Sequence, residues 1–195
     1  GDWCVEHHGG VPRAVTDLTV EFAYGDLADL ERVFAENQGG IAGVIITPVG
    51  HPLALPVVAP PDGYLQAVVD LCHANDTPVC FDEIRTGFRV AMGGASERYG
   101  VTPDLMTVGK AMANGYPISA LVGKRDVMEV YLKGAFLSST FFPNSLEMVA
   151  AMTCMDILER EKVQDAIWER GTRFLERLGG IVDASGVPVT MSGIP

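Results

Sequence analysis

Two short apolar runs in this chain end in side chains that could do chemistry together. Val79 to Phe81 is followed by the carboxylates Asp82 and Glu83, and a second run ends at Gly109 and Lys110. In a parallel α/β sheet, ligands bind at the carboxyl ends of the strands. A carboxylate there can hold a cationic group, and a partly desolvated lysine has a lowered pKa and becomes a nucleophile. The spacing therefore predicts a site in which Asp82 and Lys110 contact one ligand.

The residue types match the needs of pyridoxal phosphate. That cofactor takes a lysine for a Schiff base and a carboxylate beside its ring nitrogen, tasks that suit Lys110 and Asp82. Ile84 would share the side of Asp82 if the strand continued, and could pack on the ring. Ser139 and Thr140 lie in a polar loop before a predicted helix and could bind the phosphate. Taken singly, the polar residues have ordinary alternatives: a helix cap or solvated turn for the Asp-Glu pair, a surface lysine for Lys110 and a loop hydroxyl for Thr140.

The sequence around these residues predicts alternating helices and strands. Helices are expected over 26–37, 62–74, 125–132, 145–161 and 163–178, and strands over 42–47, 79–81, 105–108 and 118–122. This alternation is typical of an α/β fold with a mainly parallel sheet and flanking helices. The run 42–47 is expected to be buried on both faces. Asp26 is expected to cap its helix, Gly179-Gly180 to end the last one, and strand-like pieces to follow in 181–195.

Composition and motifs argue against several classes of function. The 195 residues are 48% hydrophobic with a net charge of -11, which argues against nucleic acid or an anionic membrane surface as partner. No apolar run reaches the roughly 20 residues of a membrane span. The four cysteines lack CxxC spacing, so we expect free thiols, no metal site and a cytoplasmic location. Gly109-Lys110-Ala111 lacks the rest of a phosphate-binding GxxxxGK[ST] loop, which disfavours a nucleotide-binding module.

A longer stretch resembles a known family. FDEIRTGFRVAMGGASERYGVTPDLMTVGKAMANGYPISALVG, residues 81–123, resembles the cofactor-binding segment of class III pyridoxal-phosphate aminotransferases, most of all the branch with glutamate-1-semialdehyde aminomutase. GVIITPV (43–49) and STFFPNSL (139–146) resemble the flanking motifs of that family. The resemblance implies a fold type I large domain. It also implies that Lys110 is the Schiff-base lysine, that Asp82 pairs with the pyridinium nitrogen and that Ile84 packs on the ring.

The resemblance carries further expectations about assembly and reaction. Thr140 would reach the phosphate of the partner subunit's cofactor, so a homodimer with shared active sites is implied. The implied reaction moves an amino group from an amine or amino acid to a keto or aldehyde acceptor. The alternatives are an intramolecular amino transfer, as in the aminomutases, and a non-catalytic fragment of the fold. Thr47 and Arg85 stand where many relatives have glutamate and glutamine.

Family members are longer than this chain, so we expect it to be incomplete at both ends. On that expectation, residues 1–162 are part of the cofactor-binding large domain. Residues 163–195 would be a connecting helix and the start of a small C-terminal domain.

Overall fold

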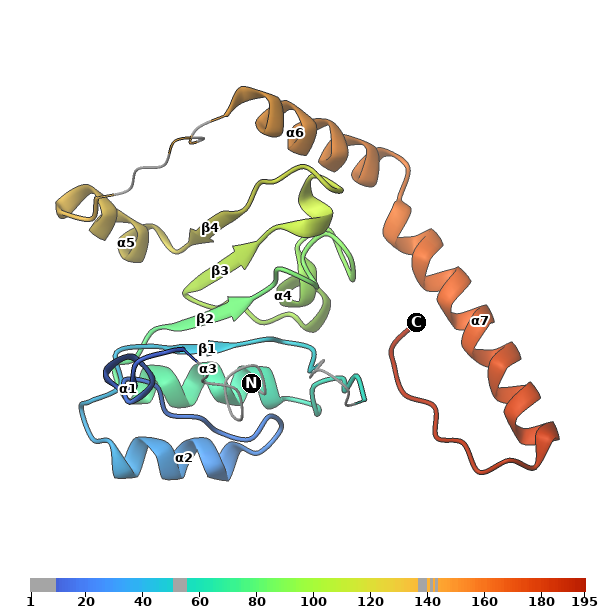
Figure 1. Ribbon diagram of the computed structural model, residues 1–195, viewed down its shortest axis with the longest axis horizontal. Coiled ribbons are helices and arrows are strands. Elements are labelled where there is room, and N and C mark those ends of the chain that lie inside the picture. Colours follow the sequence, from blue (N-terminus) through green and yellow to red (C-terminus); the bar gives the residue numbers. More distant parts are fainter. Residues whose placement is uncertain (1–9, 51–55, 137–139, 141, 143) are drawn as a thin grey trace.

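The fold is built on one mixed sheet. The computed structural model describes residues 10–195 except 51–55, 137–139, 141 and 143. Its strands lie side by side in the order β1-β2-β3-β4 (Figure 1). They are β1 (Val44–Ile46), β2 (Val79–Asp82), β3 (Leu105–Val108) and β4 (Ala120–Gly123). The pairs β1–β2 and β2–β3 are parallel, as predicted, whereas β4 pairs with β3 in the antiparallel direction.

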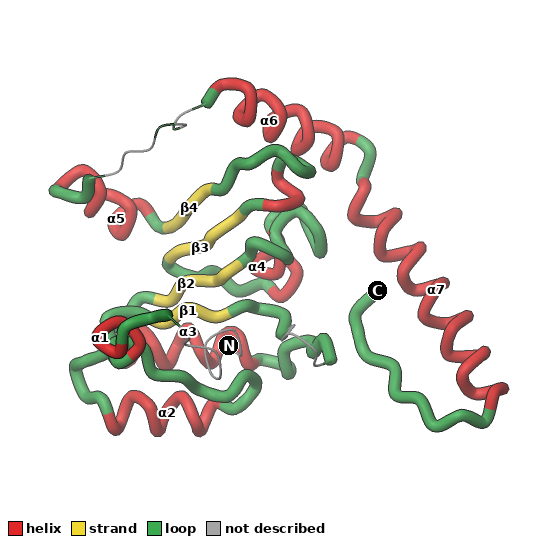
Figure 2. Tube along the Cα trace, in the orientation of Figure 1, coloured by secondary structure: helices red, strands yellow, loops and turns green. Residues whose placement is uncertain are grey.

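Helices flank this sheet, which confirms the predicted α/β class. They are α1 (Arg13–Thr16), α2 (Leu27–Glu36), α3 (Tyr64–Ala74), α4 (Gly94–Tyr99), α5 (Arg125–Met128), α6 (Ser145–Arg160) and α7 (Val163–Ser185). Two 3-10 turns, η1 (Lys110–Met112) and η2 (Glu129–Lys133), complete the elements of the described chain. Figure 2 shows α2 and α3 beside the β1 end of the sheet and α6 beyond β4. Among the described helices, none is both long and apolar enough to cross a membrane.

The main core lies between the first two strands and helices α2 and α3. In α3, apolar side chains recur at the i, i+3, i+4, i+7 spacing of one helix face and are all buried: Leu65, Val68, Val69 and Cys72. They pack with Val79 and Phe81 of β2, both 0% exposed. Burial of each large apolar side chain contributes roughly 1.5–3 kcal/mol, so this cluster holds β2 in place.

Strand β1 departs from the prediction that both of its faces are buried. Val44 and Ile46 are buried in the core, but Ile45 between them is 64% exposed. Successive side chains of a strand point to opposite faces. Among the described residues, α2 and α3 cover one face at this edge strand, which leaves Ile45 in contact with solvent.

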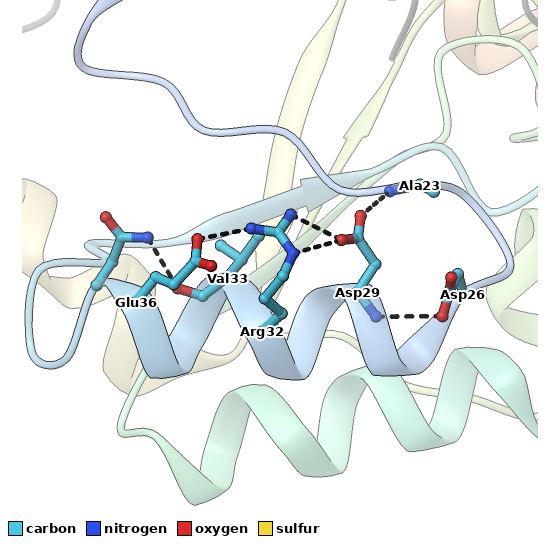
Figure 3. Close-up of polar contacts among 7 residues, drawn as sticks. Ala23, Asp26, Asp29, Arg32, Val33 and Glu36 are labelled. Atoms are coloured by element: carbon cyan, nitrogen blue, oxygen red, sulfur yellow. Dashed lines mark hydrogen bonds and ion pairs between the residues drawn. The ribbon is translucent and has the colours of Figure 1, made fainter.

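Helix α2 begins where the sequence predicts, because Asp26 caps it. The Asp26 carboxylate accepts the Asp29 backbone N–H at 3.1 Å (Figure 3). Asp29 in turn accepts the Ala23 N–H at 2.8 Å, which ties the incoming chain to the helix. Arg32 bridges Asp29 and Glu36 at 2.7 and 2.6 Å. The Ala23 hydrogen bond and then Arg32 lower the pKa of the Asp29 carboxyl.

The last helix is longer than predicted. Gly179 and Gly180 do not end α7, which continues to Ser185 and stops at Gly186, a left-handed residue with φ 67°. Glycine lowers helix propensity without preventing a helix, whereas a left-handed glycine is a common C-terminal signal. The strand-like pieces expected in 181–195 are not found; the chain after α7 has no regular secondary structure.

The first turns of α7 are bound to the segment that follows β2. The side-chain amide of Gln164 donates to the Phe88 carbonyl at 2.9 Å. The Trp168 indole N–H donates to the Val90 carbonyl at 2.8 Å. The division of the chain into 1–162 and 163–195 stays a prediction, and these contacts place the start of α7 against the sheet domain.

Candidate functional site

The site forms where two neighbouring parallel strands end. Asp82 is the last residue of β2 and lies opposite Thr107 in β3. Lys110 follows β3 across Gly109 and begins the η1 turn. Parallel strands end at the same edge of a sheet. The structure therefore brings Asp82 and Lys110, which are 28 residues apart in the sequence, to adjacent strand ends.

The Asp82 carboxylate is held by its neighbours and keeps acceptor capacity. It is half-buried, and its Oδ1 accepts the Ile84 backbone N–H at 3.0 Å and the Thr107 hydroxyl at 3.3 Å. Within the described residues, no hydrogen bond goes to Oδ2. Burial first, and then the charge of Asp82, raise the pKa of the adjacent Cys80 thiol. The arrangement leaves one carboxylate oxygen for a cationic ligand group.

Thr107 is a site residue that sequence reasoning missed. A threonine within a strand is ordinary by itself, since β-branched residues favour strands. Thr107 can contact Asp82 because the pairing of β2 with β3 sets the two residues opposite each other. That register cannot be known until the two strands are known to pair. The one signal in the sequence is that Thr107 lies three residues before Lys110, on the strand that carries it.

Ile84 reaches the site by a different route from the one predicted. The strand does not continue past Asp82; Ile84 lies in a turn, where its N–H bonds to the Asp82 side chain. Aspartate side chains commonly start such turns. A Cβ on Gly109 would lie 3.1 Å from Cδ1 of Ile84, so the glycine leaves room for this side chain. Ile84 thus packs beside the backbone that precedes Lys110.

Lys110 has an uncommon backbone conformation. Its φ is +41°, in the left-handed region that non-glycine residues rarely occupy and that costs about 1–3 kcal/mol. Such strain clusters at functional sites. The side chain is exposed, so the described residues alone do not supply the desolvated surroundings expected for it. An exposed amine and a partly free carboxylate at adjacent strand ends can bind a ligand with an aldehyde and a cationic nitrogen.

The hydroxyl loop is not brought to this pair within the chain. Ser139 lies outside the described residues, and Thr140 is exposed in the connection from η2 to α6. From their residue types alone, Ser139 and Thr140 were candidate phosphate contacts of this site. Because β4 is antiparallel, its carboxyl end leads to the opposite edge, where α5 follows (Figure 1). A role for Thr140 at Lys110 of the same chain is therefore not supported.

A charged cluster holds that opposite edge together. Asp104, just before β3, is 6% exposed and accepts Lys124 Nζ at 2.8 Å, His73 Nε2 at 2.9 Å and the Val79 N–H at 2.8 Å. Burial acts to raise the pKa of the Asp104 carboxyl, but the hydrogen bonds from these partners outweigh it and lower that pKa. Lys124 is thus held by a carboxylate, whereas Lys110 is exposed at the other edge.

An apolar cavity of about 730 Å³ borders the η1 turn. Ala111 of η1 and Ala113, just after that turn, line it together with apolar side chains of α6 and α7, among them Ile157 and Ile167. Cys154 of α6 also lines it and donates its thiol to the Ala111 carbonyl at 3.4 Å. Helix α6 therefore supports the turn that carries Lys110.

The amino-acid sequence of the chain matches one family. The family model Aminotransferase class-III matches residues 12–191, which is most of the chain. The protein therefore belongs to the class III aminotransferase family.

Individual relatives agree with that family. The chain is 48% identical over 194 residues to a 3-aminobutyryl-CoA aminotransferase of Cloacimonas acidaminovorans, which covers 100% of this chain and 47% of the relative. It is 35% identical over 187 residues to a glutamate-1-semialdehyde 2,1-aminomutase of Syntrophobacter fumaroxidans, covering 95% of this chain and 43% of the relative. The chain thus spans about half the length of these curated relatives.

A solved structure has the same fold. The FumI protein of Sphingopyxis sp. MTA144, described in a form with pyridoxal phosphate, superposes with a TM-score of 0.91 at 25% identity. The match covers 99% of this chain and 46% of that one. The expectation of a fold type I aminotransferase fold, present here in part, is confirmed.

Proposed function

We propose that this chain is part of a pyridoxal-phosphate-dependent aminotransferase. The observation that carries the proposal is the placement of Asp82 and Lys110 at adjacent ends of β2 and β3. Membership of the class III family and the likeness to the FumI protein support it. The reaction proposed is transfer of an amino group between an amine or amino acid and a keto or aldehyde acceptor.

The residues present fit the cofactor. Oδ2 of Asp82 accepts no hydrogen bond among the described residues, Gly109 leaves space beside Ile84, and the Lys110 amine is exposed. When bound, pyridoxal phosphate supplies an aldehyde and an electron-withdrawing ring. Lys110 would hold it at the aldehyde carbon, Asp82 at the ring nitrogen and Ile84 at the ring face.

The residues of the chain would then divide the work as follows. The Thr107 hydroxyl and the Ile84 N–H both donate to Oδ1 of Asp82, which would hold the carboxylate in one orientation. An ionised Asp82 stabilises a positive charge at the ring nitrogen. Nζ of Lys110 would act as the general base for the proton on the amine-bearing substrate carbon.

Assembly and location complete the proposal. We propose a homodimer in which Thr140, with Ser139, contacts the phosphate of the cofactor in the partner subunit. The exposed position of Thr140, away from the strand ends of its own chain, supports a contact across subunits. We also propose a cytoplasmic location, which the free thiols of Cys72, Cys80 and Cys154 support.

A transfer between two substrates is favoured over the aminomutase alternative. The chain is 48% identical to a protein named for 3-aminobutyryl-CoA and 35% identical to one named aminomutase. A β-amino acyl thioester is therefore the first amino donor to test, with pyruvate and 2-oxoglutarate as acceptors. Glutamate-1-semialdehyde tests the alternative.

The test compares two lysine variants of the purified full-length protein. Lys110→Ala should lose the visible absorption of bound cofactor and amino transfer to the acceptors. Lys124→Ala, which removes an amine bound to Asp104 at the other edge, should keep both. Amino transfer retained in Lys110→Ala would contradict the proposal, and a well-folded wild type that binds no cofactor would favour a non-catalytic protein.

A further inference from the structure

Glu83, directly after Asp82, is buried without serving as a ligand contact. Its side chain is 0% exposed, and its backbone N–H still bonds to the Thr107 carbonyl of β3 at 2.9 Å. Neighbouring residues of an extended chain point to opposite faces. The Asp82 carboxylate therefore stays at the end of β2, whereas the Glu83 carboxylate points to the other face and is buried in the protein.

Four hydrogen bonds satisfy the Glu83 carboxylate. Oε2 accepts the Thr86 hydroxyl at 2.5 Å and the Ala95 N–H at 2.8 Å. Oε1 accepts the Ser96 N–H at 2.8 Å and the Ser96 hydroxyl at 2.9 Å. Hydrogen bonds to an ionised acceptor are stronger than neutral ones, and a buried carboxylate needs them. Glu83 thus joins the end of β2 to its following turn and to α4.

The chain makes room for this carboxylate. Gly94 has φ +69°, and a Cβ on it would overlap the Glu83 carboxylate group. Gly87 passes close to the Glu83 backbone, and its N–H donates to the Glu83 carbonyl at 2.8 Å. A Cβ on Gly87 would lie 2.8 Å from that same carbonyl oxygen. Two glycines are therefore used to fold residues 84–94 tightly around one glutamate.

The turn held by Glu83 is the one that positions the cofactor contacts. Its first residue, Ile84, donates its N–H to Oδ1 of Asp82 and packs beside Gly109, next to Lys110. If the Glu83 carboxylate is lost, Thr86 and the start of α4 lose their common anchor. The Ile84 N–H is then free to move, and Asp82 loses one of its two orienting hydrogen bonds.

We propose that Glu83 is a positioning residue for the cofactor, acting through the Ile84 turn on Asp82. The proposal rests on the proposed function, because it assigns Asp82 to the ring nitrogen. At metal sites, loss of a group that orients a ligating side chain typically costs about ten- to a hundred-fold in affinity, and we take that range as the scale expected for Glu83.

The test measures the dissociation constant of pyridoxal phosphate in the full-length protein by visible absorption, with no substrate present. Glu83→Gln keeps the shape but not the charge, and should weaken cofactor binding by about tenfold or more. Glu97→Gln is the matched control. Glu97 also accepts a backbone N–H of this segment, that of Gly93 at 2.5 Å, and within the described part of the chain no hydrogen bond joins its side chain to Ile84. The Glu97→Gln variant should therefore bind the cofactor with the affinity of the wild type.

A double-mutant cycle separates positioning from general loss of structure. In an Asp82→Asn background, Glu83→Gln should cause little further loss of cofactor affinity, because Glu83 acts through Asp82. If the double variant instead loses the product of the two single fold-losses in affinity, Glu83 does not act through Asp82 and the inference is wrong. The inference also fails if folded Glu83→Gln binds the cofactor as tightly as the wild type.

A second variant covers the case in which Glu83→Gln does not fold. Thr86→Val removes one hydroxyl donor to Glu83 and conserves shape, so it should weaken cofactor binding several-fold; wild-type affinity in Thr86→Val would overturn the inference. Failure of the proposed function looks different. In that case the wild type itself takes up no cofactor, whereas failure of the inference leaves a wild type that binds it normally.

Discussion

The Lys110 backbone stores strain at the residue that carries the proposed chemistry. Its φ of +41° follows Gly109, which is extended at φ -176°, and the chain turns at once into η1. Glycine adopts positive φ without the steric cost that a Cβ brings. The sequence calls for a lysine at a position where glycine would fit the backbone better. This is the pattern expected where function and stability compete.

Glycine should therefore be more stabilising than alanine at position 110. We expect Lys110→Gly to exceed Lys110→Ala by about 1 kcal/mol in the free energy of unfolding, measured by urea denaturation. Lys124 provides the control, since its φ is -59° and glycine there should be the less stable of the two. Equal stability of the two variants at 110 would contradict the strained conformation.

Among the helices and turns, the sequence predicted correctly a feature that a single side chain decides. Asp26 was predicted to cap its helix, and its carboxylate accepts the Asp29 backbone N–H at the start of α2. The turn at Ile84 was missed because it depends on a hydrogen bond to the Asp82 side chain that strand periodicity does not encode. The end of α7 was missed because a glycine pair within a helix resembles a stop signal.

The glycines of α7 give opposite predictions at two positions. A Cβ on Gly179 would meet nothing within 4 Å, and its φ is not positive, so Gly179→Ala should stabilise the protein by about 0.4–1 kcal/mol. Gly186, at φ +67°, ends the helix, and Gly186→Ala should destabilise by roughly 1–2 kcal/mol. Thermal denaturation of both variants measures the effect. Destabilisation by Gly179→Ala would show that α7 ends earlier.

For the whole molecule, the sequence predicted the fold class and the pair of strand ends. It did not predict that β4 runs antiparallel to β3, because hydrophobic patterning carries no strand direction. That direction decides which residues share the Lys110 edge and which, like Lys124, share the Asp104 edge. The partners of Thr140 also remain a proposal, since they are expected to come from a second subunit.

The Asp104 cluster makes overall stability depend on pH. It joins α3, β2 and the end of β4 through His73, Val79 and Lys124. Because the folded-state pKa of Asp104 is lowered, its contribution is complete above the usual aspartate pKa. The contribution is lost as the pH falls through the folded-state value.

We therefore expect Asp104→Asn to destabilise the protein by about 1–3 kcal/mol at neutral pH. The difference from the wild type should shrink below about pH 4. Urea denaturation across pH measures this. Asp70→Asn, at an exposed carboxylate of α3 that accepts a hydrogen bond from Gln66, should change stability by less than about 0.5 kcal/mol. A difference for Asp104→Asn that persists unchanged in acid would contradict the assignment.

The most direct test of the account is the chemical identity of the lysine that holds the cofactor. The full-length protein is mixed with pyridoxal phosphate, reduced with borohydride and digested with trypsin, and the peptides are analysed by mass spectrometry. The account predicts one modified peptide, Tyr99–Lys124, with the pyridoxyl group on Lys110 and no cleavage after it. A label on Lys124, Lys133 or Lys162, or no label on a folded protein, would contradict it.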